Sequence, residues 1–253
     1  TGSTQVIHGS SVSLIALPSA GFLFSSWTGA DAASLSSTTV SNPTIVMAGD
    51  YSVTANFVAR RTLTISSSVG GSVTPVSPNA VADGTTVTLV ATPQANYTFT
   101  GWSGADAADL SSMTLTSVTV LMNSDKSVAA NFLPVMRTLT VSAGTGGTAT
   151  PAGATQRMQG SSVSLLAQPD AGYLFSSWTG TDAARLSSTA GPNPPLMMSG
   201  DYSVTANFVV KRTLTRTASA GGSVNLSSPQ AVPDGTTLSL TATPNAGFNF
   251  LGW

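Results

Sequence analysis

The chain has 253 residues, of which 41% are hydrophobic and 8% are charged, and its formal net charge is −1. A nearly neutral chain offers no basic face for the phosphate contacts that dominate nucleic-acid binding, so we expect no nucleic-acid partner. No apolar run reaches the roughly 18 to 20 residues that span a bilayer as a helix, so we expect no membrane span. Cysteine is absent, which excludes disulfides and thiolate metal sites.

The composition favours a folded β-protein. Ser and Thr together supply 74 residues, all ten acidic residues are Asp, and Glu is absent. Glu and Lys favour helices, whereas Thr and Val suit the half-buried surface of a strand. Substantial apolar content with almost no net charge argues against disorder.

Several landmarks recur about every 75 residues, which predicts a tandem array. Arg-Thr-Leu-Thr, Gly-Gly and Ala-Asn-Phe all keep this spacing, as do the four tryptophans Trp27, Trp102, Trp178 and Trp253. We therefore expect a partial module over 1–60, complete modules over 61–136 and 137–211, and a partial module over 212–253. We number these modules one to four.

Modules one and three match each other best, as do modules two and four, so the duplicated unit is expected to be a pair of modules. The chain begins and ends inside modules. Two interpretations follow: the sequence is a window on a longer array, or the end modules complete each other between neighbouring chains by strand donation.

Module two, taken in chain order, predicts six short strands. The alternation of apolar and polar residues and the Gly, Pro and Asp turn signals place them over 62–66, 72–74, 85–92, 97–102, 118–122 and 128–132. An Ala-rich stretch over 105–112 predicts one or two helical turns capped by Asp106. Trp102 is out of phase with Phe99 by one residue, which predicts a β-bulge at Gly101.

The predicted fold is therefore mainly β, a tandem array of small antiparallel β-rich modules with one short helix each. Only a few residues separate the last strand of one module from the first strand of the next. Flexible linkers need more chain than that, so we expect a stiff rod.

Recurring aromatic residues are the predicted core of each module, because large aromatics in a small module usually pack inside. The competing hypothesis is that they stack on sugars. The predicted core set is Trp27, Trp102, Trp178, Trp253, Phe57, Phe132, Phe208, Phe24, Phe99, Phe175 and Phe250.

Few residues carry catalytic or metal-binding potential. His8 is the only histidine and stands at a turn position without an orienting partner, so no catalytic residue is predicted. Recurring acids are expected to cap or form turns rather than to bind calcium, and no cofactor or metal is predicted; they are Asp31, Asp106, Asp182, Asp50, Asp125 and Asp201. Recurring amides are expected to bond backbone at an edge strand or a junction; they are Asn56, Asn131 and Asn207.

The block Phe-x-Gly-Trp-Ser-Gly at Phe99 to Gly104, followed by Val-x-Val-x-Met and Ser-Val-x-Ala-Asn-Phe ending at Phe132, resembles the divergent internalin-type B repeat of bacterial surface proteins. The resemblance covers the whole chain and implies a small β-grasp-like module that serves as a stalk, spacer or adhesive segment. It implies no catalytic residue. Modules one and three depart from the pattern with Ser-Ser before the tryptophan, which puts a common bulge in doubt there.

The leading hypothesis is a structural segment of an exported bacterial protein at the cell surface, forming a stiff stalk or a self-assembling filament. Uncharged strand edges are templates for pairing, so self-association with identical chains is expected. The alternative is an adhesin module that binds glycans or proteins of a host or a neighbouring cell. An enzyme is not expected.

Overall fold

The structure is a computed structural model that describes residues 2–253. It divides into two compact units, the first ending at Leu133 and the second beginning at Pro134. Strands dominate both units. Within residues 2–253 the helical segments are three single 3-10 turns, η1 (Ala32–Ser34), η2 (Ala107–Asp109) and η3 (Ala183–Arg185).

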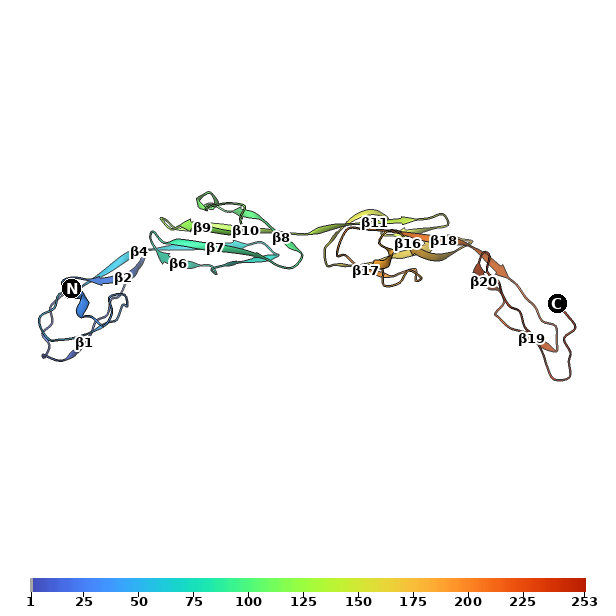
Figure 1. The fold of residues 1–253 in the computed structure, drawn as a ribbon, viewed down its shortest axis with the longest axis horizontal. Helices are drawn as coiled ribbons and strands as arrows, with labels where there is room; N and C mark the ends of the chain where they lie inside the picture. Colours follow the sequence, from blue (N-terminus) through green and yellow to red (C-terminus); the bar gives the residue numbers. More distant parts are fainter. Residues whose placement is uncertain (1) are drawn as a thin grey trace. The chain divides into compact units, whose positions relative to one another are not determined.

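The first unit is organised around a mixed sheet that runs through modules one and two. Its strand order is β2-β4-β10-β8, with β6 also paired to β4 (Figure 1). The strands are β2 (Phe22–Thr28), β4 (Thr54–Ser67), β6 (Asn79–Ala82), β8 (Tyr97–Ser103) and β10 (Lys126–Pro134). β2 and β6 run antiparallel to β4, whereas β10 runs parallel to it, so the first and last strands of module two are parallel neighbours.

A second, antiparallel sheet completes module two. It has the order β5-β7-β9 and consists of β5 (Gly71–Thr74), β7 (Thr86–Pro93) and β9 (Ser117–Leu121). Burial alternates along β7, with Val87, Leu89 and Ala91 buried. These side chains form one core with residues of the mixed sheet, including Leu63, Val128 and Trp102. Module two is therefore two small sheets that bury their facing sides against each other.

β4 continues through the boundary between modules one and two. Its residues up to Ala59 pair with β2, and its residues from Arg60 onward pair with β6 and β10. The sequence predicted two strands joined by a short connection, but the connection is itself strand. The rest of module one holds β1 (Ser11–Ser13) paired with β3 (Thr44–Val46).

The second unit repeats this plan. Its mixed sheet has the order β13-β11-β18-β16, with β20 also paired to β18 and with β11 and β18 parallel. The strands are β11 (Met136–Ala143), β13 (Gly153–Met158), β16 (Tyr173–Thr179), β18 (Tyr202–Leu214) and β20 (Gln230–Pro233). The 13-residue β18 passes from module three into module four, as β4 passes from one into two.

The second sheet is less continuous in module three than in module two. It consists of two pairs, β12 (Gly147–Thr150) with β15 (Leu166–Pro169) and β14 (Ser162–Ser164) with β17 (Pro195–Met197). Pro194 and Pro195 stand where module two has Val118 and Thr119. Proline has no N–H to donate, so the ladder is interrupted there. Module four adds β19 (Gly222–Val224) paired with β21 (Ala242–Pro244).

The predicted fold class is confirmed, with two differences in detail. The predicted short helix is a single 3-10 turn, and the Asp that precedes each turn makes no side-chain capping hydrogen bond. β6 was not predicted, because four residues between Pro78 and Asp83 are too short to show a clear alternation.

Candidate functional site: the tryptophan core and its supports

The tryptophans of modules one to three occupy equivalent places in the core. Trp27, Trp102 and Trp178 are 8%, 5% and 2% exposed. Each indole Nε1 donates a hydrogen bond to the backbone oxygen 13 residues further along, at 3.0, 2.9 and 3.0 Å respectively. A buried indole N–H needs such an acceptor, and the bond pins the loop after the 3-10 turn over the core.

A β-bulge precedes the tryptophan in modules one and three. The register of β2 against β4 shifts between Phe24 and Ser26, and that of β16 against β18 shifts between Phe175 and Ser177. The Ser-Ser sequence before Trp27 and Trp178 therefore still forms a bulge. In module two Gly101 has φ of +137°, a conformation that favours glycine.

The recurring asparagines hold these bulges. The side-chain Nδ2 of Asn56, Asn131 and Asn207 donates to the backbone oxygen of the residue just before the tryptophan on the neighbouring strand, at 3.2, 3.2 and 3.3 Å. The same Nδ2 donates to a hydroxyl two residues beyond, at 2.8, 2.9 and 2.8 Å. The amide thus ties the strand that carries the tryptophan to its neighbour at the point where the ladder is irregular.

The Gly-Gly pair lies beneath two aromatic rings. A Cβ on Gly70, which has φ of +102°, would lie 2.0 Å from the ring of Tyr97, and a Cβ on Gly71 would lie 2.4 Å from the ring of Phe132. Module three repeats both contacts, with Tyr173 over Gly146 and Phe208 over Gly147. The sequence predicted only a turn at Gly-Gly, because nothing local indicates which ring covers it.

The predicted core residues differ in burial. Phe132 is 3% exposed, and Phe24, Phe99, Phe175 and Phe208 are half-buried. Phe57, however, is 40% exposed, Phe250 is 48% exposed and Trp253 is 71% exposed. The Gly-Gly hairpin that covers Phe132 has no counterpart among residues 2–60.

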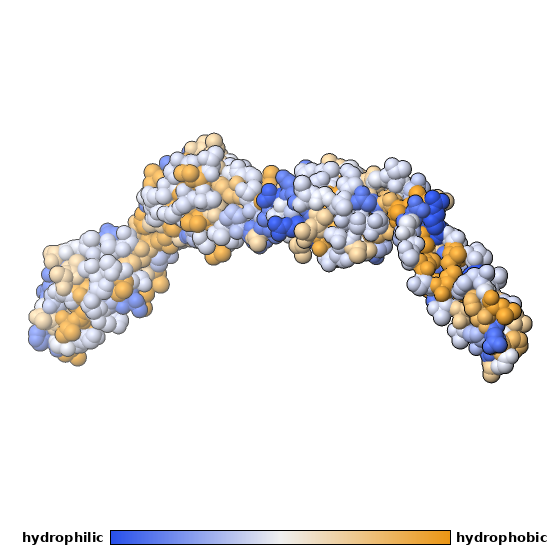
Figure 2. Space-filling view, turned by 45° about the vertical axis from the view of Figure 1, so that its right-hand side comes forward, coloured by the Kyte–Doolittle hydropathy of each residue, from blue (hydrophilic) through white to orange (hydrophobic). Residues whose placement is uncertain are grey.

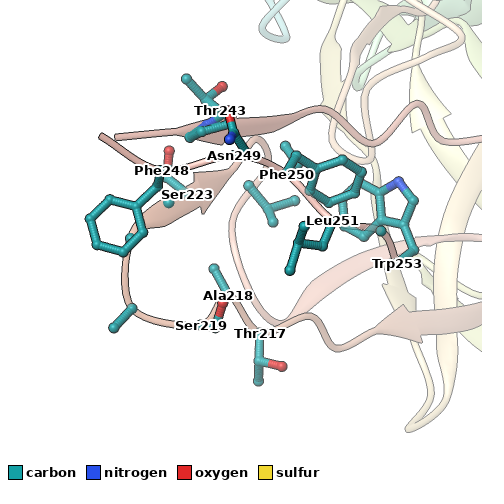
Figure 3. A pocket seen from close by; sticks show the side chains of 17 residues that line it. Thr217, Ala218, Ser219, Ser223, Thr243, Phe248, Asn249, Phe250, Leu251 and Trp253 are labelled. Atoms are coloured by element: carbon teal, nitrogen blue, oxygen red, sulfur yellow. The ribbon is translucent and has the colours of Figure 1, made fainter. Parts of the chain in front are cut away.

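Local geometry around the last pair is nevertheless close to that of the equivalent pair in module two. Phe250 and Trp253 have ring centroids 5.4 Å apart at 65°, close to the 5.6 Å and 64° of Phe99 and Trp102. Both rings line an open cleft together with Phe248 and Leu251 (Figure 3). The Phe-x-x-Trp arrangement is therefore set by its own short segment.

Two series of aspartates tie backbone segments together. Asp31, Asp106 and Asp182 each accept the N–H of the residue 21 positions later, at 2.7, 2.7 and 2.8 Å. Asp125 and Asp201 accept the N–H groups of Thr62 and Thr138, at 2.8 Å each, and so connect the turn before the last strand of a module to the start of its first strand. Among residues 2–253 no group of three or more metal-ligating side chains is assembled.

Arginines at the module junctions meet the turn that precedes β7 or its equivalent. Arg61 lies 2.6 Å from Asp83, and Arg212 lies 2.7 Å from Asp234. The hydrogen bond from the Arg212 guanidinium, together with its charge, holds the pKa of Asp234 below its usual value near 3.8. Any stability from this pair is present above the unfolded pKa of Asp234 and is lost as the pH falls through its folded pKa.

Module two alone buries a lysine in its core. Lys126 is 8% exposed, and its Nζ lies 2.5 Å from Oδ2 of the half-exposed Asp109. Modules one and three have tyrosines there, Tyr51 and Tyr202, and neither has an acid in place of Asp109. The Lys–Asp pair is therefore a paired substitution: the acid appears only where the buried cation does.

We expect Asp109→Ala to destabilise module two by about 2 kcal/mol, because the buried ammonium loses its partner. The double variant Lys126→Tyr with Asp109→Ser restores the residues of module one and should return within about 1 kcal/mol of the parent chain. Urea unfolding followed by hydrogen exchange on module-two peptides measures both. Equal stability of Asp109→Ala and the parent would contradict the pairing.

The fold and these supports define a tandem repeat of a small two-sheet module with a buried tryptophan. Comparison with known families finds the divergent InlB B-repeat domain in four consecutive stretches, residues 1–61, 61–135, 137–212 and 212–253. The chain therefore belongs to the divergent InlB B-repeat family. No curated protein and no solved structure gives a match.

The family supports a coarse assignment. Its members are repeat modules of bacterial surface proteins, and such modules are typically structural or binding rather than catalytic. No helix within residues 2–253 is long and apolar enough to cross a membrane.

Proposed function

We propose that this chain is a structural segment of an exported bacterial surface protein, in which the modules over 1–60, 61–136, 137–211 and 212–253 form a stiff stalk or a self-assembling filament. The observation that carries the proposal is the unbroken strand at two module boundaries. β4 and β18 each belong to the sheets of two successive modules, so bending there must distort a paired strand rather than a free linker.

The outer face of the β5-β7-β9 sheet supports self-association. Thr86, Thr88, Val90 and Thr92 alternate with the buried residues of β7 and are all exposed. Thr119 lies opposite Thr88, and Leu121 lies opposite Thr86 on β9. This face carries no charge, and uncharged flat strands pair or stack readily with other chains.

The same absence of charge extends over much of the surface. In Figure 2 most of the visible surface has the pale colour of weakly polar residues, and strongly hydrophilic side chains gather in only a few places. Only 8% of the residues are charged. Soluble proteins commonly use about 25 to 35% charged residues on the surface to prevent association, so little opposes contact between copies here.

Light scattering and electron microscopy of the purified chain over a range of concentrations test the proposal, and we expect assemblies that grow with concentration. Ser13→Lys, Thr88→Lys and Ser164→Lys together place one charge on the exposed face of the equivalent strand in each of modules one to three and should suppress assembly. The matched control adds three lysines at the exposed turn residues Ala20, Ala95 and Ala171 and should not. A chain that stays monomeric at high concentration would rule out the filament.

The alternative, an adhesin that stacks glycans on tryptophan, requires accessible indoles. Burial of Trp27, Trp102 and Trp178 leaves little ring surface for a sugar, which favours the structural role. In acrylamide quenching we expect Trp253→Phe to remove most of the accessible fluorescence. Strong quenching that persists in this variant would favour the adhesin.

A further inference from the structure

Module three differs from modules two and four at the junction described above. Modules two and four have Arg61, Val81 and Asp83, or Arg212, Val232 and Asp234, at equivalent positions. Module three has Arg137, Arg157 and Gln159 instead. One position gains a positive charge and another loses a negative one, so the three side chains carry +2 in module three and 0 in the other two.

The pairing of β11 with β13 places the two arginines together. Arg137 and Arg157 are directly opposite in the antiparallel register, so their side chains leave the same face of the sheet. Both are half-buried. Arg137 donates from Nε to Oε1 of Gln159 at 2.8 Å, in place of the carboxylate that Arg61 and Arg212 meet.

Neither arginine has an acidic partner. The three ion pairs formed among residues 2–253 involve other side chains, and the buried Nε of Arg157 has no hydrogen-bond partner. Asp201 lies near the start of β11, but it accepts the N–H of Thr138 just as Asp125 accepts that of Thr62 in module two. Asp201 therefore does not account for the difference between the modules.

Two like charges opposite each other on a sheet are unfavourable, and an unpartnered buried donor adds to the cost. An oxyanion between the two guanidinium groups would relieve the repulsion between them, because guanidinium binds carboxylate, phosphate or sulfate through paired, charge-assisted hydrogen bonds. We propose that Arg137 and Arg157 form a binding site for an oxyanion group, a site present in module three and absent from modules two and four.

The site extends the proposed function without depending on it, since a stalk or an adhesin could equally hold an anionic group. The probes are inorganic phosphate, inorganic sulfate and trigalacturonate, a carboxylate-bearing sugar, each compared with chloride at equal ionic strength. We expect saturable shifts of the Arg137 and Arg157 amide signals in NMR spectra with a dissociation constant of roughly 1 mM for inorganic phosphate or sulfate. Either preference supports the site. Tighter binding of the inorganic ions would identify a free ion as the ligand, and tighter binding of trigalacturonate would identify an acidic sugar.

The repeat provides matched controls in the full chain. Arg157→Val with Gln159→Asp gives module three the residues with which module four already folds, and it should weaken binding at least tenfold. Val81→Arg with Asp83→Gln transfers the pattern to module two and should raise the stoichiometry from one anion per chain to two. Shifts that do not saturate, that match those in chloride, or that persist in the first variant would overturn the proposal.

Discussion

Trp178→Ala is expected to destabilise module three by about 4 kcal/mol, among the largest effects of any single substitution in the chain. The indole is 2% exposed, and truncation removes both its packing and the hydrogen bond to the carbonyl of Gly191. Trp178→Phe keeps part of the packing but leaves that carbonyl without its donor, so we expect a smaller loss of about 2 kcal/mol.

Trp253→Ala is the matched control, because Trp253 is 71% exposed in the same Phe-x-x-Trp segment. It should change stability by no more than about 0.5 kcal/mol. Hydrogen exchange of peptides from each module, followed during guanidinium unfolding, measures the stability of module three in Trp178→Ala and of module four in Trp253→Ala. Similar losses for Trp178→Ala and Trp253→Ala would show that burial is not the source of the effect.

The second large effect is expected for Gly71→Ala. The added Cβ would lie 2.4 Å from Cζ of Phe132 and 2.5 Å from two further atoms of that ring. Either the buried ring or the β5 strand must move, at a cost of about 3 kcal/mol. Gly71 does not have a positive φ, so the loss would come from the close approach and not from backbone strain.

Gly49→Ala serves as its control, since a Cβ there meets no atom within 4 Å. We expect a change of at most about 0.5 kcal/mol in that variant. A Phe132→Leu background should reduce the effect of Gly71→Ala, because the ring tip that causes the clash is gone. Thermal unfolding of the parent chain, Gly71→Ala, Phe132→Leu and the double variant measures the coupling between the two substitutions. Strictly additive losses of stability would be evidence against contact between Gly71 and Phe132.

Part of the fold could be predicted from local patterns in the sequence. The 75-residue period, the alternation along β7 and the displaced phase of Trp102 are local signals, and they predicted the β class, most strands and the inward position of Trp102. The sequence also led us to doubt a bulge at Ser-Ser, but the structure has one there, and Asn56 and Asn207 bond across it from another strand. That support comes from 30 residues away along the chain, where local patterns carry no information.

Other features depended on pairings that no short segment encodes. Asp106 stands before a helical turn and looks like its cap, yet its carboxylate reaches Ser127 across the fold. The parallel pairing of β4 with β10 joins residues 63 positions apart. The sequence also does not show that β4 crosses a module boundary, because the residues on both sides of the boundary favour a strand. The charge change at Arg157 and Gln159 was visible in the sequence, but its meaning required the register that places Arg157 opposite Arg137.

The parallel pair at the centre of module two has a mechanical consequence. The chain enters the module along β4 and leaves it along β10, and these strands lie side by side with Leu63 opposite Lys126 and Ser67 opposite Ala130. Tension applied through the chain would pull the two strands in opposite directions along their length. The hydrogen bonds between them would then be sheared together instead of being opened one after another, and β11 and β18 would respond in the same way in module three.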